Sequence, residues 1–236
     1  MKITTLLSPA MFESSITDIQ HKTVVVIDIL RATSTMTVAM ENGARAIYPV
    51  RDVETASRAG SSFVKAGERN GEKVEGFDLG NSPKEFQPDI VRNRDIVMTT
   101  TNGTKAIAMS ENAQEILIAS YRNIDATLKH LQEHSKDVVL FCSGWKNVIN
   151  VEDTLFAGEI ASTLHSLGYA IQNDATYVAM AVYSQHNKKP KDIVSKASHA
   201  KRISRLSSSD DIDICLMRNT FHEALKVVDG VVVVAS

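Results

Sequence analysis

The sequence is poor in cysteine and contains no long apolar run. Cys142 and Cys215 are the only cysteines among 236 residues, and neither belongs to a CxxC pair. This excludes a disulfide framework and gives no sign of zinc, and the apolar neighbours of both cysteines predict buried thiols in a reducing compartment. No apolar run approaches the roughly 20 residues that a membrane helix needs, and the N-terminal MKITTLLSPA lacks a signal-peptide core. We therefore expect a cytoplasmic chain with no membrane partner.

An excess of positive charge is also missing. The 26 Lys and Arg residues stand against 28 Asp and Glu residues, so the formal net charge is −2. A broadly basic surface that follows nucleic-acid phosphates is excluded, and we expect no nucleic-acid partner. Hydrophobic residues make up 43% and charged residues 23% of the chain, which excludes a disordered protein. Any anion site must therefore be a local arrangement of donors.

Strand and helix patterns alternate along most of the chain. The β-branched run at 23–30 predicts a strand buried on both faces, followed by a helix that Ser34 or Thr35 caps and that ends near Asn42-Gly43. The periodicity predicts further strands at 46–50, 95–99, 115–119 and 137–142. It predicts helices at 52–65, 104–110, 124–134, 151–168, 175–185, 189–206 and 211–218.

Two regions depart from this alternation. Residues 67–89 carry glycine and proline at turn spacing and predict a long functional loop, and the Asp229-Gly230 turn in the tail predicts a β-hairpin. Together the patterns predict a three-layer α/β/α fold with a largely parallel or mixed sheet, closed by the hairpin as an antiparallel edge. We expect one domain over 1–236, and a boundary between two α/β subdomains near 168–174 stays open. The hairpin either caps a sheet edge or pairs across a subunit interface, so a homo-oligomer also stays open.

Polar residues collect where the predicted strands end and in the long loop. In open α/β sheets, ligands bind outside the carboxyl ends of the strands. The candidate site residues at these places are Asp28, Arg31, Thr33, Ser34, Thr35, Glu68, Asp78, Asn81, Ser82, Thr101, Asn102, Gly103, Thr104, Glu152 and Asp153. A helix N-terminus and an arginine suit a phosphoryl group, and carboxylates suit Mg²⁺. These clusters predict an anion that is handled together with a divalent cation.

Each of these residues also has a purely structural interpretation. Asp28 can end a strand, Ser34 or Thr35 can cap a helix, and Asn102-Gly103 can form a tight turn. Glu152 and Asp153 suit the first turn of a helix through the helix dipole. His199 lies within a helix pattern, where packing or solvent exposure is the ordinary expectation. The functional interpretation depends on several clusters meeting at the strand exits.

Several segments in fixed order match one known pattern. They are VVVIDILRATSTMTVAMENGA, GERNG, GFDLGNSP, TTTNGTKAI, CSGWKN followed by VEDTLFAGEI, and ASHAKRI with DIDIC, and they extend from Val24 to Cys215. In these segments the chain resembles the 2-phosphosulfolactate phosphatase family. The resemblance implies a Mg²⁺-dependent phosphatase that converts 2-phosphosulfolactate to 3-sulfolactate and phosphate, a step of coenzyme M biosynthesis. Such a substrate carries a phosphate, a sulfonate and a carboxylate, which fits a site with several donor clusters.

The motifs and the resemblance together assign roles to the candidate residues. The predicted catalytic residues are Asp28, Arg31 and Glu68, with Glu68 as the base for the attacking water. The predicted metal ligands are Asp28, Asp78, Glu152 and Asp153. Arg31 and the helix start at Thr33–Thr35 are expected to bind the phosphoryl group. Asn81, Ser82 and Thr101–Thr104 are expected to bind the remaining oxygens or the sulfonate.

Three alternatives stay open. Haloacid-dehalogenase-type phosphatases attack through an aspartate in a DxD pair, whereas Asp28-Ile29-Leu30 lacks the second acid, so we favour direct attack by water. The substrate can be another phosphorylated hydroxy acid. A non-catalytic sensor of such anions would keep the donor loops but would not need the acidic metal ligands.

Overall fold

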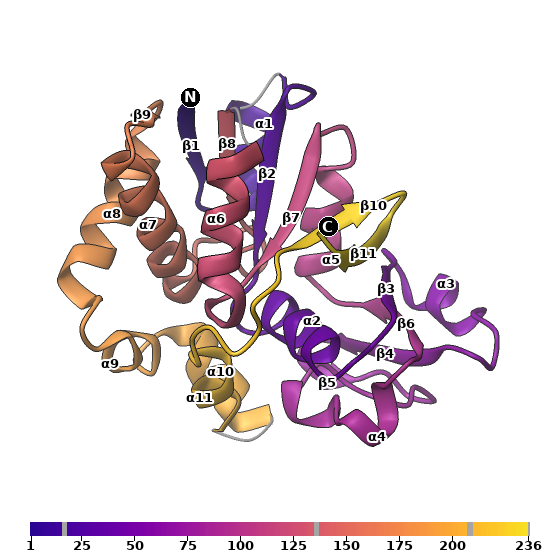
Figure 1. The fold of residues 1–236 in the computed structure, drawn as a ribbon. Coiled ribbons are helices and arrows are strands. Elements are labelled where there is room, and N and C mark those ends of the chain that lie inside the picture. Colours follow the sequence, from indigo (N-terminus) through magenta and orange to yellow (C-terminus); the bar gives the residue numbers. More distant parts are fainter. Residues whose placement is uncertain (16–17, 135–136, 207–209, 236) are drawn as a thin grey trace.

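The described residues form an eleven-stranded mixed sheet with helices on both faces (Figure 1). The computed structural model describes residues 1–15, 18–134, 137–206 and 210–235. The strands are β1 (Lys2–Leu6), β2 (Lys22–Ile27), β3 (Ala46–Pro49), β4 (Val64–Arg69), β5 (Glu72–Lys73), β6 (Asp95–Thr99), β7 (Glu115–Ala119), β8 (Asp137–Cys142), β9 (Ala170–Ile171), β10 (Leu225–Val228) and β11 (Val231–Val234). Their order across the sheet is β5-β4-β6-β3-β11-β10-β7-β2-β8-β1-β9.

Among the described residues, the helices cover two large hydrophobic cores, and Ala56, Phe77 and Val97 form a small third cluster. The helices are α1 (Pro9–Ser15), α2 (Ala32–Glu41), α3 (Val53–Ser57), α4 (Pro88–Val91), α5 (Gly103–Met109), α6 (Ile124–His134), α7 (Val151–Ser166), α8 (Asp174–His186), α9 (Pro190–Val194), α10 (Ser198–Leu206) and α11 (Asp210–Cys215), with short 3-10 helices η1 (Pro83–Glu85) and η2 (Tyr121–Asn123). Along β2, Val25 and Ile27 belong to one large core, which we call the first core. Val24 and Val26 belong to the other, the second core. This alternation confirms a strand buried on both faces and the predicted α/β/α class.

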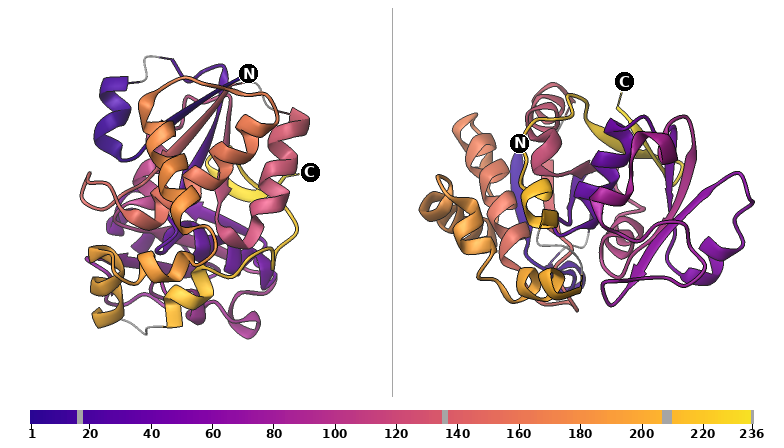
Figure 2. Two further views of the ribbon diagram at one scale, coloured as in Figure 1. Left: turned by 90° about the vertical axis from the view of Figure 1, so that its left-hand side faces the viewer. Right: turned by 90° about the horizontal axis from the view of Figure 1, so that it is seen from below.

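Two groups of parallel strands run in opposite directions. β7, β2, β8, β1 and β9 are mutually parallel, and β3, β6 and β4 form a second parallel group. We call these the first and the second half-sheet. The hairpin β10–β11 pairs antiparallel with β7 on one side and with β3 on the other, so it joins the half-sheets and reverses their direction. Seen from below, β3–β6 lie on the opposite side of the molecule from α7–α9 (Figure 2).

The position of this hairpin corrects a prediction. A hairpin exists around Asp229-Gly230 as expected, but it lies within the sheet and does not close its edge. Leu225 of β10 and Val232 of β11 are fully buried in the second core, which explains the interior location. The antiparallel edge is formed instead by the two-residue strand β5 beside β4.

The hairpin should therefore contribute to global stability. Leu225→Ala removes a fully buried side chain at the junction of the half-sheets, and we expect the free energy of unfolding to fall by about 3 kcal/mol. Urea unfolding followed by circular dichroism measures this loss. Val228→Ala is the matched control on the same strand, because Val228 is 43% exposed and should lose little. Equal losses in the two variants would contradict the interior role of the hairpin.

The segment 46–89 contains the largest secondary-structure errors. The helix expected at 52–65 is limited to α3, which Asp52 caps by accepting from Thr55 N–H at 2.7 Å. β4 then starts at Val64 because Val64 and Ala66 face the second core. Residues 67–89, expected as a loop, include the β4–β5 hairpin around Asn70-Gly71, whose positive φ values of 56° and 86° suit that dipeptide.

Other elements differ at their boundaries. β1, α1 and β9 were not expected, and β1 inserts between β8 and β9 at one side of the sheet. The helix expected at 189–206 is divided into α9 and α10. α2 begins at Ala32, so Ser34 and Thr35 lie inside the helix and neither caps it. The strand exits nevertheless come together as expected, because residues after β2, β6 and β8 line one cleft.

Candidate active site

A polar cleft lies where the carboxyl ends of β2, β6 and β8 meet the β4–β5 hairpin and α10. Six of the residues predicted from the sequence line it, namely Asp28, Arg31, Glu68, Asn81, Thr101 and Asn102. Trp145, His199 and Arg202 also line the cleft and were not predicted as site residues. The cleft therefore combines carboxylates, cations and amide or hydroxyl groups, as small anionic ligands require.

Asp28 is one of two buried carboxylates that line the cleft, the other being Glu68. The side chain of Asp28 follows β2 and accepts a hydrogen bond at Oδ1 from Ala32 N–H at 3.3 Å. Burial raises the pKa of Asp28 from 3.8 to about 6, against the opposing effects of His199 and of a hydrogen bond with Ser143. An ionised Asp28 is costly to bury, and such a carboxylate gains most from a cation in the cleft.

Asp153 joins two strand exits from the first turn of α7. Its Oδ1 accepts from Ile29 N–H at 2.8 Å and its Oδ2 accepts from Gly144 N–H at 3.1 Å. Burial raises the pKa of Asp153 well above its usual range, and the nearby Asp28 raises it further. Asp153 is fully buried and does not line the cleft, and its hydrogen bonds to Ile29 and Gly144 hold the exits of β2 and β8 together.

Glu152 and His199 form a buried hydrogen-bonded pair, although 47 residues separate them in the sequence. Nδ1 of His199 lies 2.7 Å from Oε1 of Glu152, and only 5% of His199 is exposed. Oε2 of Glu152 has no hydrogen-bond partner among the described residues. His199 lines the cleft, where it can contact a ligand. Its position within a helical sequence pattern did not indicate this. A carboxylate that bonds one ring nitrogen orients the imidazole for chemistry at the other.

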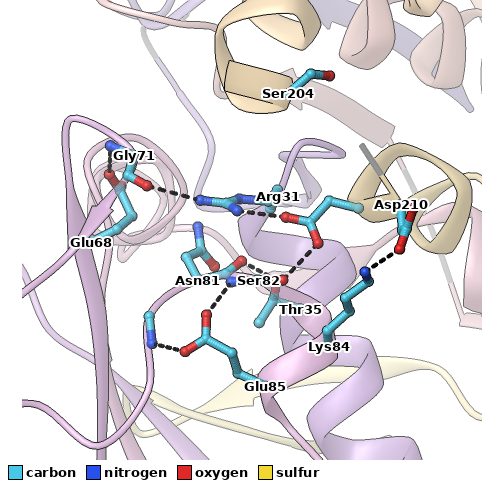
Figure 3. Close-up of polar contacts among 12 residues, drawn as sticks. Arg31, Thr35, Glu68, Gly71, Asn81, Ser82, Lys84, Glu85, Ser204 and Asp210 are labelled. Atoms are coloured by element: carbon cyan, nitrogen blue, oxygen red, sulfur yellow. Dashed lines mark hydrogen bonds and ion pairs between the residues drawn. The ribbon is translucent and has the colours of Figure 1, made fainter. Parts of the chain in front are cut away.

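Arg31 belongs to a network that the sequence showed only in part. Its Nη1 donates to Asp211 Oδ2 at 2.6 Å, and Nη2 donates to Gly71 O at 3.3 Å (Figure 3). Ser82 Oγ donates to Asp211 Oδ1 at 2.6 Å, so Asp211 holds both predicted residues. Asp211 is fully buried and was not predicted, because 180 residues separate it from Arg31. The network fixes the guanidinium of Arg31 at the cleft wall.

Glu68 connects two loops beside the cleft. Its Oε2 accepts from Gly71 N–H and its Oε1 accepts from Thr101 N–H, both at 2.6 Å. The first contact closes the turn between β4 and β5 (Figure 3), and the second reaches the exit of β6. Both carboxylate oxygens thus have backbone donors, which is the arrangement of a side chain that positions loops.

The predicted hydroxyl donors point into the protein. Thr33 Oγ1 donates to Asp28 O at 3.0 Å, and Ser34 Oγ donates to Ile29 O at 2.8 Å. Thr35 Oγ1 donates to Asn81 O at 2.9 Å (Figure 3). Thr104 Oγ1 likewise donates to Thr100 O at 2.9 Å. None of these four residues lines the cleft, and their contacts hold its walls in place.

Asp78 lies apart from the other predicted metal ligands. Its side chain is exposed, and Oδ2 accepts from Lys65 N–H at 2.8 Å. Asp78 does not line the cleft. The structure brings Asp28 and Glu152 near Asp153, but it leaves Asp78 at the surface.

Gly103 must stay small for Asp28 to keep its place. A Cβ at Gly103 would lie 2.5 Å from Ala32 Cβ and 2.9 Å from Asp28 Oδ2. We expect Gly103→Ala to displace the carboxylate and lower kcat by about 10²-fold, because small displacements at a reacting centre are costly. Steady-state kinetics measures the effect. Gly60→Ala is the control, since the nearest atom to its Cβ is 3.9 Å away, and equal activity of both variants would contradict this packing.

Comparison with known proteins assigns the chain to a family. The model of the family described as "2-phosphosulpholactate phosphatase" matches residues 9–230. The chain belongs to this family. A relative named probable 2-phosphosulfolactate phosphatase from Caldanaerobacter subterraneus is 36% identical over 91% of each chain. Relatives with the same name are 38% identical in Clostridium acetobutylicum, over 85% of this chain and 87% of the relative, and 36% identical in Thermotoga maritima, over 90% and 92%.

Family membership agrees with the resemblance drawn from the motifs. The family is one of phosphoric monoester hydrolases, so the chain belongs to a class of enzymes. Among the described residues, no helix has both the length and the apolar character that spanning a membrane requires. Cys142 and Cys215 are free and buried, as predicted.

The cleft supplies oxygen ligands suited to a hard cation. Two buried atoms, Asn81 Oδ1 and Thr101 Oγ1, have no hydrogen-bond partner among the described residues. Asn81 and Thr101 are among the residues that line the cleft, as is Asp28. The described part of the chain contains no group of three His, Cys, Asp or Glu side chains arranged to hold a metal. Mg²⁺ usually takes only one or two carboxylates and completes its octahedron with water and substrate oxygens, so this donor set fits it.

Proposed function

We propose that this chain is a Mg²⁺-dependent phosphatase that hydrolyses 2-phosphosulfolactate to 3-sulfolactate and phosphate, as a step of coenzyme M biosynthesis. The observation that carries the proposal is the buried Asp28 carboxylate in a cleft shared with Arg31 and His199. The family match and the names of the relatives support the substrate. A substrate with three anionic groups suits a cleft that contains two arginines.

His199 is proposed to protonate the leaving group. Nδ1 is held by Glu152 at 2.7 Å, which leaves Nε2 for the ester oxygen of the substrate. As the bond from phosphorus to that oxygen breaks, Nε2 delivers a proton and the alcohol leaves neutral. Arg31, held by Asp211, stabilises negative charge on the phosphoryl oxygens during this step.

Asp28 and Asn81 are the residues proposed to hold Mg²⁺. When bound, the cation would polarise the phosphoryl oxygens and neutralise their charge. Asp153 supports Asp28 by holding the neighbouring backbone at Ile29. The missing second acid of a DxD pair favours direct attack by water on phosphorus over a phosphoaspartyl intermediate at Asp28.

Phosphate release from a set of esters tests the proposal. We expect the purified chain to hydrolyse 2-phosphosulfolactate with a kcat/KM at least tenfold above that for 2-phospholactate or 3-phosphoglycerate. Equal rates for all three would show that the sulfonate is not recognised. Tight binding of 2-phosphosulfolactate without turnover in saturating Mg²⁺ would instead identify a sensor.

A further inference from the structure

The cleft contains two arginines with different charge environments. Arg31 is neutralised by the buried Asp211 at 2.6 Å. Arg202 of α10 has no carboxylate partner among the described residues, and its Nη2 donates a hydrogen bond to Asn70 O. A guanidinium has five N–H donors, so Arg202 retains donors and its full charge in a cleft built for anions.

Arg202 is nevertheless held in a defined position. Its guanidinium lies 5.0 Å from the ring centroid of Trp145, whose ring also stacks on His199 at 6.0 Å. Stacking on an aromatic face leaves the in-plane N–H groups free to bind a ligand. Trp145 follows β8 and Arg202 belongs to α10, so two segments distant in sequence build this contact.

One β-turn holds both arginines. Asn70 and Gly71 connect β4 to β5, and their carbonyl oxygens accept from Arg202 and Arg31 respectively. Glu68 fixes the turn through Gly71 N–H (Figure 3). In the same figure Ser204 marks α10, which lies on the opposite side of Arg31 from Glu85. Adjacent carbonyls thereby tie both arginines of the cleft to the same turn.

The spacing on α10 matches the spacing of groups in the substrate. His199 and Arg202 are three residues apart, so they lie on one helix face about 4.5 Å apart along the axis. In 2-phosphosulfolactate the ester oxygen and the sulfonate are attached to adjacent carbons. A helix that presents a proton donor and a cation one turn apart can therefore contact both groups at once.

We propose that Arg202, stacked on Trp145, binds the sulfonate of the substrate and determines the preference for sulfonated phosphate esters. This assignment rests on the proposed function and adds a residue that its mechanism does not use. A sulfonate offers three oxygens to the guanidinium fork, whereas an uncharged group in its place would leave the arginine unpaired in the cleft.

Paired substrates test the assignment. We expect Arg202→Gln to lower kcat/KM for 2-phosphosulfolactate by about 50-fold, mostly through KM, since hydrogen bonds to charged groups have this magnitude. Activity on 2-phospholactate, which lacks only the sulfonate, should change less than threefold. Arg202→Lys should recover part of the loss because it retains the charge without the fork. Arg205→Gln, an exposed position on the same helix that does not line the cleft, should match the wild type.

The outcomes separate this inference from the proposed function. Equal losses on both esters, or no loss on either, would overturn the sulfonate assignment while hydrolysis itself stands. If the wild type hydrolyses neither ester, the proposed function fails, and calorimetry with 3-sulfolactate and lactate then decides the binding role. Weaker binding of 3-sulfolactate alone to Arg202→Gln would support it, and unchanged binding would overturn it. Unfolding curves of each variant establish that the protein is folded in these assays.

Discussion

Asp28→Asn is expected to lower kcat for 2-phosphosulfolactate by about 10³-fold or more. Asparagine keeps the shape of the side chain but removes the negative charge that would hold Mg²⁺ beside the phosphoryl group. Asp28 is 4% exposed, so solvent cannot replace the lost ligand directly. Steady-state phosphate release in saturating Mg²⁺ measures the effect.

The same substitution should leave the protein at least as stable as the wild type. Burial raises the pKa of Asp28 from 3.8 to about 6, so the folded protein holds this proton more tightly than the unfolded chain. The contribution of Asp28 to the free energy of unfolding therefore falls as pH rises from about 4 to about 6. Without divalent cations at pH 7, the asparagine variant should show an equal or higher Tm. Activity lost together with stability retained is typical of a functional carboxylate.

Asp78→Asn is the matched control for this result. Asp78 is exposed and accepts a hydrogen bond from Lys65 N–H outside the cleft. The activity of Asp78→Asn should therefore stay within about twofold of the wild type. A large loss at Asp78 would restore it as a metal ligand, and near-normal activity at Asp28 would remove Asp28 from the mechanism. A phosphoaspartyl intermediate trapped at Asp28 would replace attack by water with a covalent route.

His199→Gln is expected to lower kcat by about 10²- to 10³-fold on alkyl phosphate esters. General acid catalysis contributes about this much, and glutamine cannot deliver a proton to the leaving oxygen. An aryl phosphate with an acidic phenol leaves without protonation, so p-nitrophenyl phosphate should lose less than tenfold. This dependence on the leaving group separates a proton donor from a residue that only maintains the cleft.

Glu152→Gln should reproduce part of the His199 effect. Its Oε1 holds Nδ1 of His199 at 2.7 Å, and a neutral amide would orient the ring less strongly. His134→Gln removes an exposed histidine from α6 and serves as the control, with activity unchanged. Equal losses on alkyl and aryl esters in His199→Gln would contradict the role as a proton donor.

The site residues that could be predicted from the sequence are those that lie next to a recognisable strand. Asp28, Thr101 and Asn102 directly follow buried strands, and the strand-exit rule placed them at one cleft because β2 and β6 end there. His199, Asp211 and Arg202 were missed because they come from the last third of the chain. Their partners lie 47, 180 and 132 residues away, and no spacing within a single sequence encodes such contacts.

The polarity of a residue did not reveal which way it points. Thr33, Ser34 and Thr35 are hydroxyl residues at a strand exit, yet each donates to a backbone carbonyl and does not line the cleft. Glu68 lines the cleft as predicted, but backbone amides occupy both of its oxygens. Side-chain direction depends on where a helix begins, and α2 begins two residues before the predicted cap.

The fold shows the same division between local and distant information. The strands at 95–99, 115–119 and 137–142 were predicted with their observed bounds because burial makes them continuously apolar. The hairpin β10–β11 was recognised from its turn, but its position between β7 and β3 depends on both half-sheets. The prediction of a helix at 52–65 was wrong. Val64 and Ala66 pack into a core whose other residues come from distant parts of the sequence, and a pattern within 52–65 does not show this packing.

Phosphate release from 2-phosphosulfolactate by the wild type and by Asp28→Asn tests the proposed Mg²⁺ dependence and the role of Asp28 together. Each protein is assayed first in EDTA and then after Mg²⁺ is added in excess. We expect release by the wild type only after Mg²⁺ is added, and no appreciable release by Asp28→Asn under either condition. Equal wild-type rates with and without Mg²⁺, or normal turnover by Asp28→Asn, would contradict the proposed mechanism.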